Sequence, residues 1–128
     1  MIKFDHIFLF SSDIQKSSLF LSSILGLPPA QYCGADMDIL RLDIDKAGAL
    51  QYHYSSDDIP KQHIAFQVDI DRFDKIANRL RLYNVVFGND PEDQPNMQTS
   101  DFLGGYGRVF FSDQDGNLFE VIAEAGTP

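Results

Sequence analysis

The sequence predicts an α+β protein made of two βαβββ modules that pair into a curved, barrel-like mixed sheet with the helices on the outside. Two observations support this. Segments with apolar residues at every second position alternate with segments of helical spacing, and the order of one strand, one helix and three strands occurs twice in the 128 residues. We expect one domain over 1–128, with module one at about 1–56, a linker at about 57–61 and module two at about 62–126.

The first module opens on an alternating segment, 2–10, which we interpret as a strand. Residues 11–13 then supply a turn and a helix N-cap, and Gly26 suits the C-terminal cap of the helix that follows. Two further alternating segments, 39–44 and 49–54, are predicted to form a hairpin. The polar stretch that follows ends in proline, as a linker often does.

The second module repeats this order. Its helix is predicted to begin near Asp69 and to end near Asn84, because the apolar residues between them have i, i+3, i+4, i+7 spacing. Strands are predicted at 62–68, 85–87, 108–112 and 118–123. The long segment 89–107 is rich in Asp, Asn, Pro and Gly, which is typical of a functional lid or of a mobile loop.

The composition limits the classes of function. Hydrophobic residues make up 44% and the net charge is −9, so we expect a globular protein that repels nucleic acid and anionic membranes. Arg41, Lys61 and Arg108 are the candidates for a local basic patch. A single cysteine, Cys33, excludes an intrachain disulfide and favours a reducing compartment. With no leader segment and no apolar run of membrane-spanning length, the sequence indicates a cytoplasmic protein.

Three polar residues interrupt predicted strands on the face opposite the large apolar side chains. His6 lies opposite Ile7 in the first strand, and His63 and Glu120 have the same relation to their neighbours in the second module. If the apolar faces pack on the helices, all three side chains point into the concave cavity. The neighbours of Glu120 in sequence are apolar, and burying an ionised carboxylate among apolar side chains costs free energy unless the carboxylate is paired or bound to a metal.

The repeat adds Gln51, which lies on the last predicted strand of module one as Glu120 lies on the last predicted strand of module two. His53 shares the face of Gln51, one pleat further along, where it is a general base, a substrate contact, a surplus ligand or only a pocket residue. Neutral imidazole and carboxylate suit Fe(II), Mn(II), Ni(II), Zn(II) or Co(II), so the sequence predicts a divalent metal site.

Four motifs resemble those of the vicinal oxygen chelate superfamily, which includes glyoxalase I, bleomycin resistance proteins and extradiol dioxygenases. They are Asp-His-Ile at 5–7, Ile-Leu-Gly-Leu at 24–27, Gln-His-Ile-Ala-Phe at 62–66 and Asp-Gln-Asp-Gly-Asn-Leu-Phe-Glu at 113–120. The resemblance covers almost the whole chain, and the last motif is its most specific part.

The resemblance implies paired βαβββ modules around a divalent metal that chelates vicinal oxygens of a small substrate. It places metal ligands at His6, His63 and Glu120, and the fourth position, which is Glu in glyoxalases and unused in dioxygenases, at Gln51. It also implies a homodimer, in which the cavity closes either within one chain or between chains. The stretch 62–80, together with the approach to the next strand at 104–107, also resembles a small dioxygenase-like branch of the superfamily that acts on aromatic or polyketide substrates.

Several reactions remain compatible with these residues. In a dioxygenase-like reaction, two histidines and Glu120 leave positions open for a catechol-like substrate and O₂, and His53 or Tyr106 handles protons. In a glyoxalase-like reaction, four ligands hold the metal and Glu120 moves the proton. In a metal-free drug-binding protein the acidic surface attracts a cationic drug. Thiol transfer to fosfomycin ranks last, because no cation cluster is present for a phosphonate.

Overall fold

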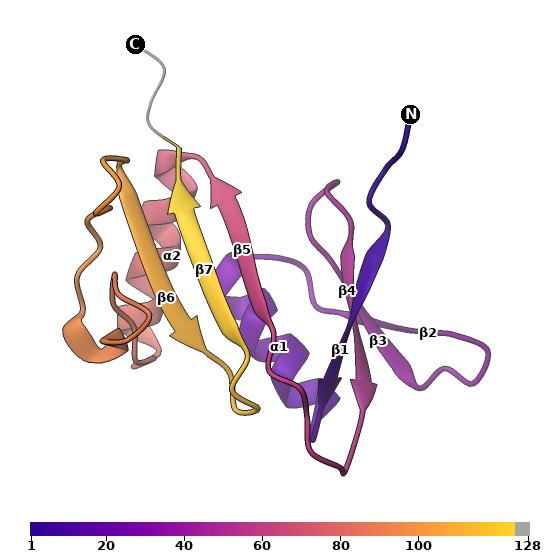
Figure 1. The fold of residues 1–128 in the computed structure, drawn as a ribbon. Coiled ribbons are helices and arrows are strands. Elements are labelled where there is room, and N and C mark those ends of the chain that lie inside the picture. The colour runs from indigo at the N-terminus through magenta and orange to yellow at the C-terminus, as the bar shows by residue number, and fades with distance from the viewer. Residues whose placement is uncertain (125–128) are drawn as a thin grey trace. The chain divides into compact units, whose positions relative to one another are not determined.

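The computed structural model describes residues 1–124, and the chain divides between Pro60 and Lys61 into two compact units (Figure 1). The strands form two separate mixed sheets, of four and three strands, and each sheet carries one α-helix. The predicted α+β class is therefore confirmed, and within residues 1–124 no strand of one sheet pairs with a strand of the other. No helix within 1–124 has the length and hydrophobicity needed to cross a membrane.

The first unit has the predicted strand–helix–three-strand order. Its elements are β1 (His6–Ser11), α1 (Ile14–Leu25), β2 (Gln31–Cys33), β3 (Ile39–Asp43) and β4 (Ala49–Tyr54). The sheet order is β1-β4-β3-β2, with β1 parallel to β4 and the other pairs antiparallel. The strand predicted at 2–10 begins only at His6, because its partner β4 begins at Ala49, after the turn that ends at Gly48.

The predicted caps of α1 are both present. The Asp13 side chain accepts a hydrogen bond from the Lys16 N–H, and Gly26 adopts φ 71° and donates its N–H to the Ser22 carbonyl. One face of α1 packs on β3 and β4, and Leu21 and Ile24 of the helix are buried, as are Leu42 and Tyr52 of the sheet. This packing fixes which face of the sheet is left for polar side chains.

The second unit consists of β5 (His63–Val68), α2 (Ile70–Leu82), the short 3₁₀-helix η1 (Gln94–Asn96), β6 (Gly107–Ser112) and β7 (Leu118–Ala123). Its sheet order is β5-β7-β6, with β5 parallel to β7 and β6 antiparallel to it. The buried residues of α2 are those that the sequence predicted, namely Phe73, Ile76, Ala77 and Leu80. The last residues assigned to module two, 125–126, lie outside the described part.

The strand predicted at 85–87 is wrong. The Val85 N–H is donated to the Leu80 carbonyl at the end of α2, and the Phe87 carbonyl accepts from Met97. The backbone of this segment is thus bonded to local partners, and only Gly88 forms a bridge, to Phe110 of β6. Asn84 does stop the helix, in a left-handed conformation with φ 54°.

The turn at 113–117 holds β5 and β7 together. Asp113 accepts hydrogen bonds from the backbone of Asp115 and Asn117, and Gly116 supplies the positive φ of 83°. The buried Asn117 side chain then accepts from the N–H of Gln62, directly before β5. The turn therefore helps to set the register that places His63 beside Glu120.

Candidate metal site

The sheet of the first unit presents three of the predicted site residues on one face. Leu50 and Tyr52 of β4 are buried on the α1 side, so the alternate residues Gln51 and His53 point to the opposite, open face. His6 lies on the same open face of the parallel strand β1. The structure therefore brings His6, Gln51 and His53 to one face, as the alternation predicted.

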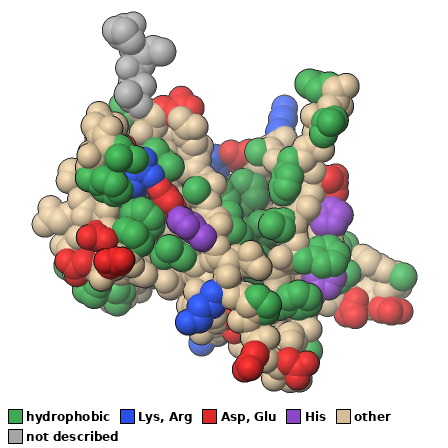
Figure 2. Space-filling view, viewed as in Figure 1, with side chains coloured by type: hydrophobic (Ala, Val, Ile, Leu, Met, Phe, Trp, Pro, Cys, Tyr) green, Lys and Arg blue, Asp and Glu red, His purple; other side chains and the backbone are tan. Residues whose placement is uncertain are grey.

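Phe8 separates these three residues. It pairs in register with Gln51, and its ring lies 5.5 Å from the ring of His6 and 4.0 Å from that of His53. Figure 2 shows hydrophobic side chains lying against histidine side chains in the first unit. The side chain of Gln51 makes no hydrogen bond to any residue within 1–124, and the buried Nε2 atom of His53 likewise has no partner there.

His6 is oriented by its neighbour in sequence. Its Nδ1 atom lies 2.6 Å from Asp5 Oδ2, and Arg41, which also bonds Asp43, approaches the same carboxylate at 3.5 Å. The hydrogen bond to His6, followed by the charge of Arg41, lowers the pKa of Asp5. A carboxylate that accepts from Nδ1 favours the tautomer whose lone pair is on Nε2, a nitrogen that can bind a cation.

The second unit brings its two predicted ligands into direct contact. His63 Nε2 lies 2.8 Å from Glu120 Oε1, and both side chains lie on the face opposite Phe119 and Val121, which pack toward α2. The residue paired with Glu120 on β5 is Ala65, whose small side chain leaves room for His63 to reach the carboxylate. Here the registers of the two units agree, since each histidine lies two residues before the partner of Gln51 or Glu120.

Glu120 has a second charged partner that the sequence did not identify. Its other oxygen, Oε2, bonds Nη1 of Arg108 on β6, and Arg108 Nε donates to Asp101 at 2.9 Å. The side chains of Arg108, Glu120 and Asp101 are 11%, 10% and 4% exposed. Burial acts to lower the pKa of Arg108, but its bonds to Asp101 and Glu120 outweigh burial and raise it.

Asp101 lies in the long segment before β6 and is the member of this buried charged group that sequence reasoning missed. Its carboxylate accepts from Arg108 and from the N–H groups of Leu103 and Gly105. The hydrogen bond from Arg108 and then that from Leu103 lower its pKa. The available signal was indirect: Arg108 lies in an apolar strand, two residues from Phe110, the pairing partner of Glu120, and a buried guanidinium has several N–H donors that need acceptors.

Tyr106 does not join this group. Its hydroxyl group lies 3.2 Å from both carboxylate oxygens of Asp74 on α2, and its ring packs edge-on against Phe73. The hydrogen bond to Asp74 raises the pKa of Tyr106. Tyr106 is therefore held against the helix, whereas Glu120 points to the face away from it.

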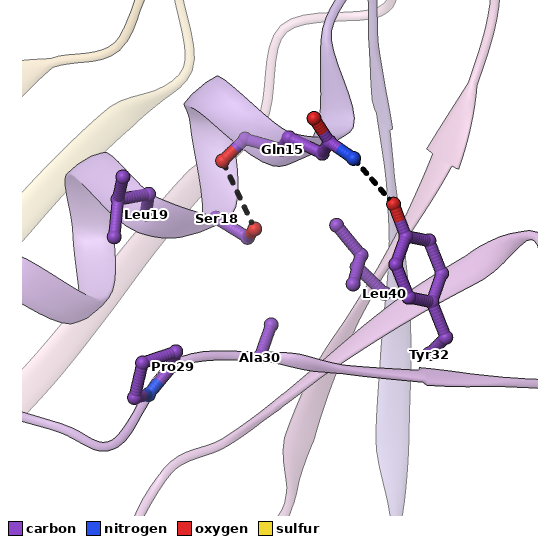
Figure 3. A pocket seen from close by; sticks show the side chains of 7 residues that line it. All are labelled: Gln15, Ser18, Leu19, Pro29, Ala30, Tyr32 and Leu40. Atoms are coloured by element: carbon purple, nitrogen blue, oxygen red, sulfur yellow. Dashed lines mark hydrogen bonds between the residues drawn. The ribbon is translucent and has the colours of Figure 1, made fainter.

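A shallow pocket of about 180 Å³ lies in the first unit between α1 and the edge of the sheet (Figure 3). Its lining residues are Gln15, Ser18, Leu19, Pro29, Ala30, Tyr32 and Leu40. The Gln15 amide donates to the Tyr32 hydroxyl at 2.6 Å across one side. The pocket lies on the helix side of the sheet, away from His6, and it contains no histidine or carboxylate.

Comparison with known proteins identifies the family. A profile of the Glyoxalase/Bleomycin resistance protein/Dioxygenase superfamily matches residues 3–121. The chain belongs to this superfamily. No curated protein sequence matches the chain significantly.

Two solved structures, of the oxidases ChaP-H1 and ChaP-H2, resemble the chain along nearly its whole length. ChaP-H1 is 27% identical, with a TM-score of 0.87 and 97% of each chain covered. ChaP-H2 is 28% identical, with a TM-score of 0.86 and 98% and 97% covered. A fosfomycin resistance protein, FosX, from Listeria monocytogenes is 22% identical at a TM-score of 0.67, covering 100% and 94%, and shows the fold alone.

The donor set fits the divalent metal that members of the superfamily commonly use. Imidazole and carboxylate are suitable ligands for such a metal. Nε2 of His63 and Oε1 of Glu120, the two atoms that would bind it, share a hydrogen bond. No group of three or more His, Cys, Asp or Glu side chains suited to a metal occurs within 1–124. His6 belongs to one unit and the His63–Glu120 pair to the other, so neither unit alone supplies the predicted set.

Proposed function

We propose that this protein is a metal-dependent, dioxygenase-like enzyme that oxidises a small aromatic substrate with vicinal oxygens. The observation that carries the proposal is the contact between His63 and Glu120, a nearly buried carboxylate held 2.8 Å from an imidazole on the open face of a sheet. A buried carboxylate is retained in such a place only when paired charges or a metal compensate its desolvation.

We propose His6, His63 and Glu120 as the three metal ligands. Two histidines and one carboxylate form the set typical of non-haem Fe(II) oxygenases, in which the metal supplies open positions for substrate and O₂. Asp5 orients His6, and Arg108 holds the second oxygen of Glu120. Gln51 is assigned outside the ligand set, because Phe8 lies in register with it and no hydrogen bond ties it to His6.

Two features support an aromatic substrate and an oxidation. Phe8 and Phe10 are partly exposed on the open face of the first unit, where aromatic rings offer a stacking surface. In addition, two of the most similar solved structures are those of oxidases. His53, whose ring packs against both phenylalanines, is proposed to handle a substrate proton.

One observation favours a second function, that of a metal-free binding protein. Arg108 neutralises Glu120 without any metal, so the carboxylate is not left uncompensated in the protein alone. Together with the charge of −9, this suits capture of a cationic small molecule. A glyoxalase-like lyase is less well supported, since it requires Gln51 as a fourth ligand.

We further propose that the protein is a cytoplasmic homodimer. Size-exclusion chromatography with light scattering measures the dimer directly. Coexpression of His6→Ala and His63→Ala chains then locates the metal site, because only a site shared between chains regains one intact ligand set in the mixed dimer. If the site closes within each chain, the mixed sample binds no metal.

Elemental analysis of the purified protein, combined with oxygen uptake on catechols, tests the proposed function. We expect bound iron and oxygen consumption in the native protein, and loss of both in His63→Ala and His6→Ala. The matched control is His53→Ala, which removes the third histidine and should keep the metal while turnover falls. Nickel or zinc with turnover of methylglyoxal and a thiol would support the lyase, and no metal uptake would leave only the binding protein.

A further inference from the structure

A continuous chain of buried charges leads from the candidate ligand Glu120 to the segment before β6. Arg108 lies in the middle, with Nη1 on Glu120 Oε2 and Nε on Asp101 Oδ1 at 2.9 Å. The ring of Phe102 lies 5.5 Å from the guanidinium and covers it on one side. Because all three charged side chains are nearly removed from water, their mutual interactions are screened far less than those of surface pairs.

The guanidinium of Arg108 and a divalent cation compete for the same carboxylate. If Arg108 had Glu120 as its sole partner, the pair would be neutral, and Glu120 would attract a metal ion weakly. Asp101 adds a second negative charge on the other side of Arg108, so the three groups together carry one net negative charge. Glu120 therefore keeps an anionic oxygen, Oε1, directed at His63.

We propose that Asp101 is a positioning residue for metal binding, which acts through Arg108 by taking up part of its positive charge and so leaves Glu120 available to a divalent cation. This rests on the proposed function, in which Glu120 is a ligand. No hydrogen bond joins Asp101 to Glu120 or His63 among residues 1–124, so the effect is electrostatic and operates through Arg108.

The backbone holds Asp101 in the orientation that this role requires. Its Oδ1 atom accepts from the N–H of Leu103 and its Oδ2 atom from the N–H of Gly105, in addition to the bond from Arg108. A Cβ at Gly105 would approach Asp101 Oδ2 to 2.3 Å, so glycine at this position permits the close contact. The carboxylate is therefore pre-organised to receive the guanidinium.

The simplest rival is that Asp101 only anchors its own segment. In that case substitution of Asp101 loosens the residues near Gly105, and a further substitution of Arg108 lowers the metal affinity again. Our proposal predicts that the further substitution raises the metal affinity again, because it removes the positive charge that competes with the metal for Glu120. The two explanations differ in the sign of the second substitution.

The experiment measures Ni²⁺ affinity by isothermal titration calorimetry in four forms of the full chain: native, Asp101→Asn, Asp101→Asn with Arg108→Lys, and Asp101→Asn with Arg108→Gln. We expect Asp101→Asn to weaken binding by roughly tenfold. The Arg108→Gln double variant should return to the native affinity or exceed it, whereas the Arg108→Lys double variant keeps the positive charge and should stay weak. Near-ultraviolet circular dichroism confirms that each form is folded.

The outcomes separate this proposal from the proposed function. Loss of Ni²⁺ binding in His63→Ala, measured beside these four forms, supports His63 as a ligand, whatever the Asp101 and Arg108 variants do. Unchanged affinity in Asp101→Asn, or a further loss in the Arg108→Gln double variant, overturns the role of Asp101 alone. Absence of Ni²⁺ binding in the native protein overturns both.

Discussion

The two units contain the same chain of contacts in different surroundings. In each, a histidine on the first strand bonds a carboxylate, the carboxylate bonds an arginine, and the arginine bonds a second carboxylate. In the first unit the residues are His6, Asp5, Arg41 and Asp43. In the second unit they are His63, Glu120, Arg108 and Asp101.

Burial gives these two chains different consequences. In the first unit Asp5 is 75% and Arg41 30% exposed, so water solvates both charges and the contacts contribute little. In the second unit the equivalent groups are almost fully buried, and each charge needs its partner. In the proposed metal site, the second unit therefore contributes the carboxylate ligand, whereas the first contributes an oriented imidazole.

The largest difference is expected between the counterpart residues Glu120 and Gln51. Glu120→Gln should reduce divalent-cation affinity by well over a hundredfold, beyond the 10–100-fold typical of groups that only support a ligand, because the ligand charge itself is lost. Gln51→Ala should change affinity by less than about threefold, since no bond ties Gln51 to His6. Calorimetric titration with Ni²⁺ measures both, and a large loss in Gln51→Ala would show four protein ligands.

The two arginines should differ next, in folding stability. Arg108→Gln leaves two buried carboxylates without a cation and should cost about 3 kcal/mol of unfolding free energy. Arg41→Gln, the matched change in the exposed chain, should cost less than about 1 kcal/mol. Urea unfolding in the absence of metal gives both values, and equal losses would contradict the importance of burial.

The parts of the fold and of the site that could be predicted from the sequence are those set by local patterns. Alternation placed His6, Gln51, His63 and Glu120 on strand faces correctly, because a packed helix commits one face of each sheet to apolar side chains. The cap signals at Asp13 and Gly26 were also local and therefore readable.

What the sequence did not predict depends on contacts between distant residues. Asp101 lies in a segment without periodicity, so nothing local marks it as the partner of Arg108 on the following strand. The short edge strand β2 has three residues, too few for a pattern. The apolar stretch 85–87 has the composition of a strand, but its backbone groups form hydrogen bonds with Leu80 at the end of α2 and with Met97 instead of with a neighbouring strand.

The residues opposite Gln51 and Glu120 provide a smaller test of the comparison. Ala65 pairs with Glu120 as Phe8 pairs with Gln51, so Ala65→Phe gives the second unit the phenylalanine that the first unit has at this position. The larger side chain should keep His63 from Glu120 and lower Ni²⁺ affinity by roughly tenfold. Phe8→Ala, the reciprocal change, should alter Ni²⁺ affinity by less than about threefold but weaken binding of an aromatic diol. Unchanged Ni²⁺ affinity in Ala65→Phe would indicate that space beside Glu120 is not what allows the contact.

The smallest expected effect concerns acid stability. Arg108 lowers the pKa of Asp101, so the resulting stabilisation is complete above about pH 4, the ordinary aspartate range, and is lost as the pH falls through the lower pKa of the folded protein. Asp101→Asn removes the carboxyl group that is protonated as the pH falls. The variant should therefore show a smaller fall in Tm between pH 5 and pH 3, measured by circular dichroism. Asp5→Asn is the matched control: the pKa of Asp5 is lowered as well, but its carboxylate is mostly in water, so its curve should stay closer to that of the native protein. Equal flattening in the two variants would mean that the buried and exposed chains respond to acid alike.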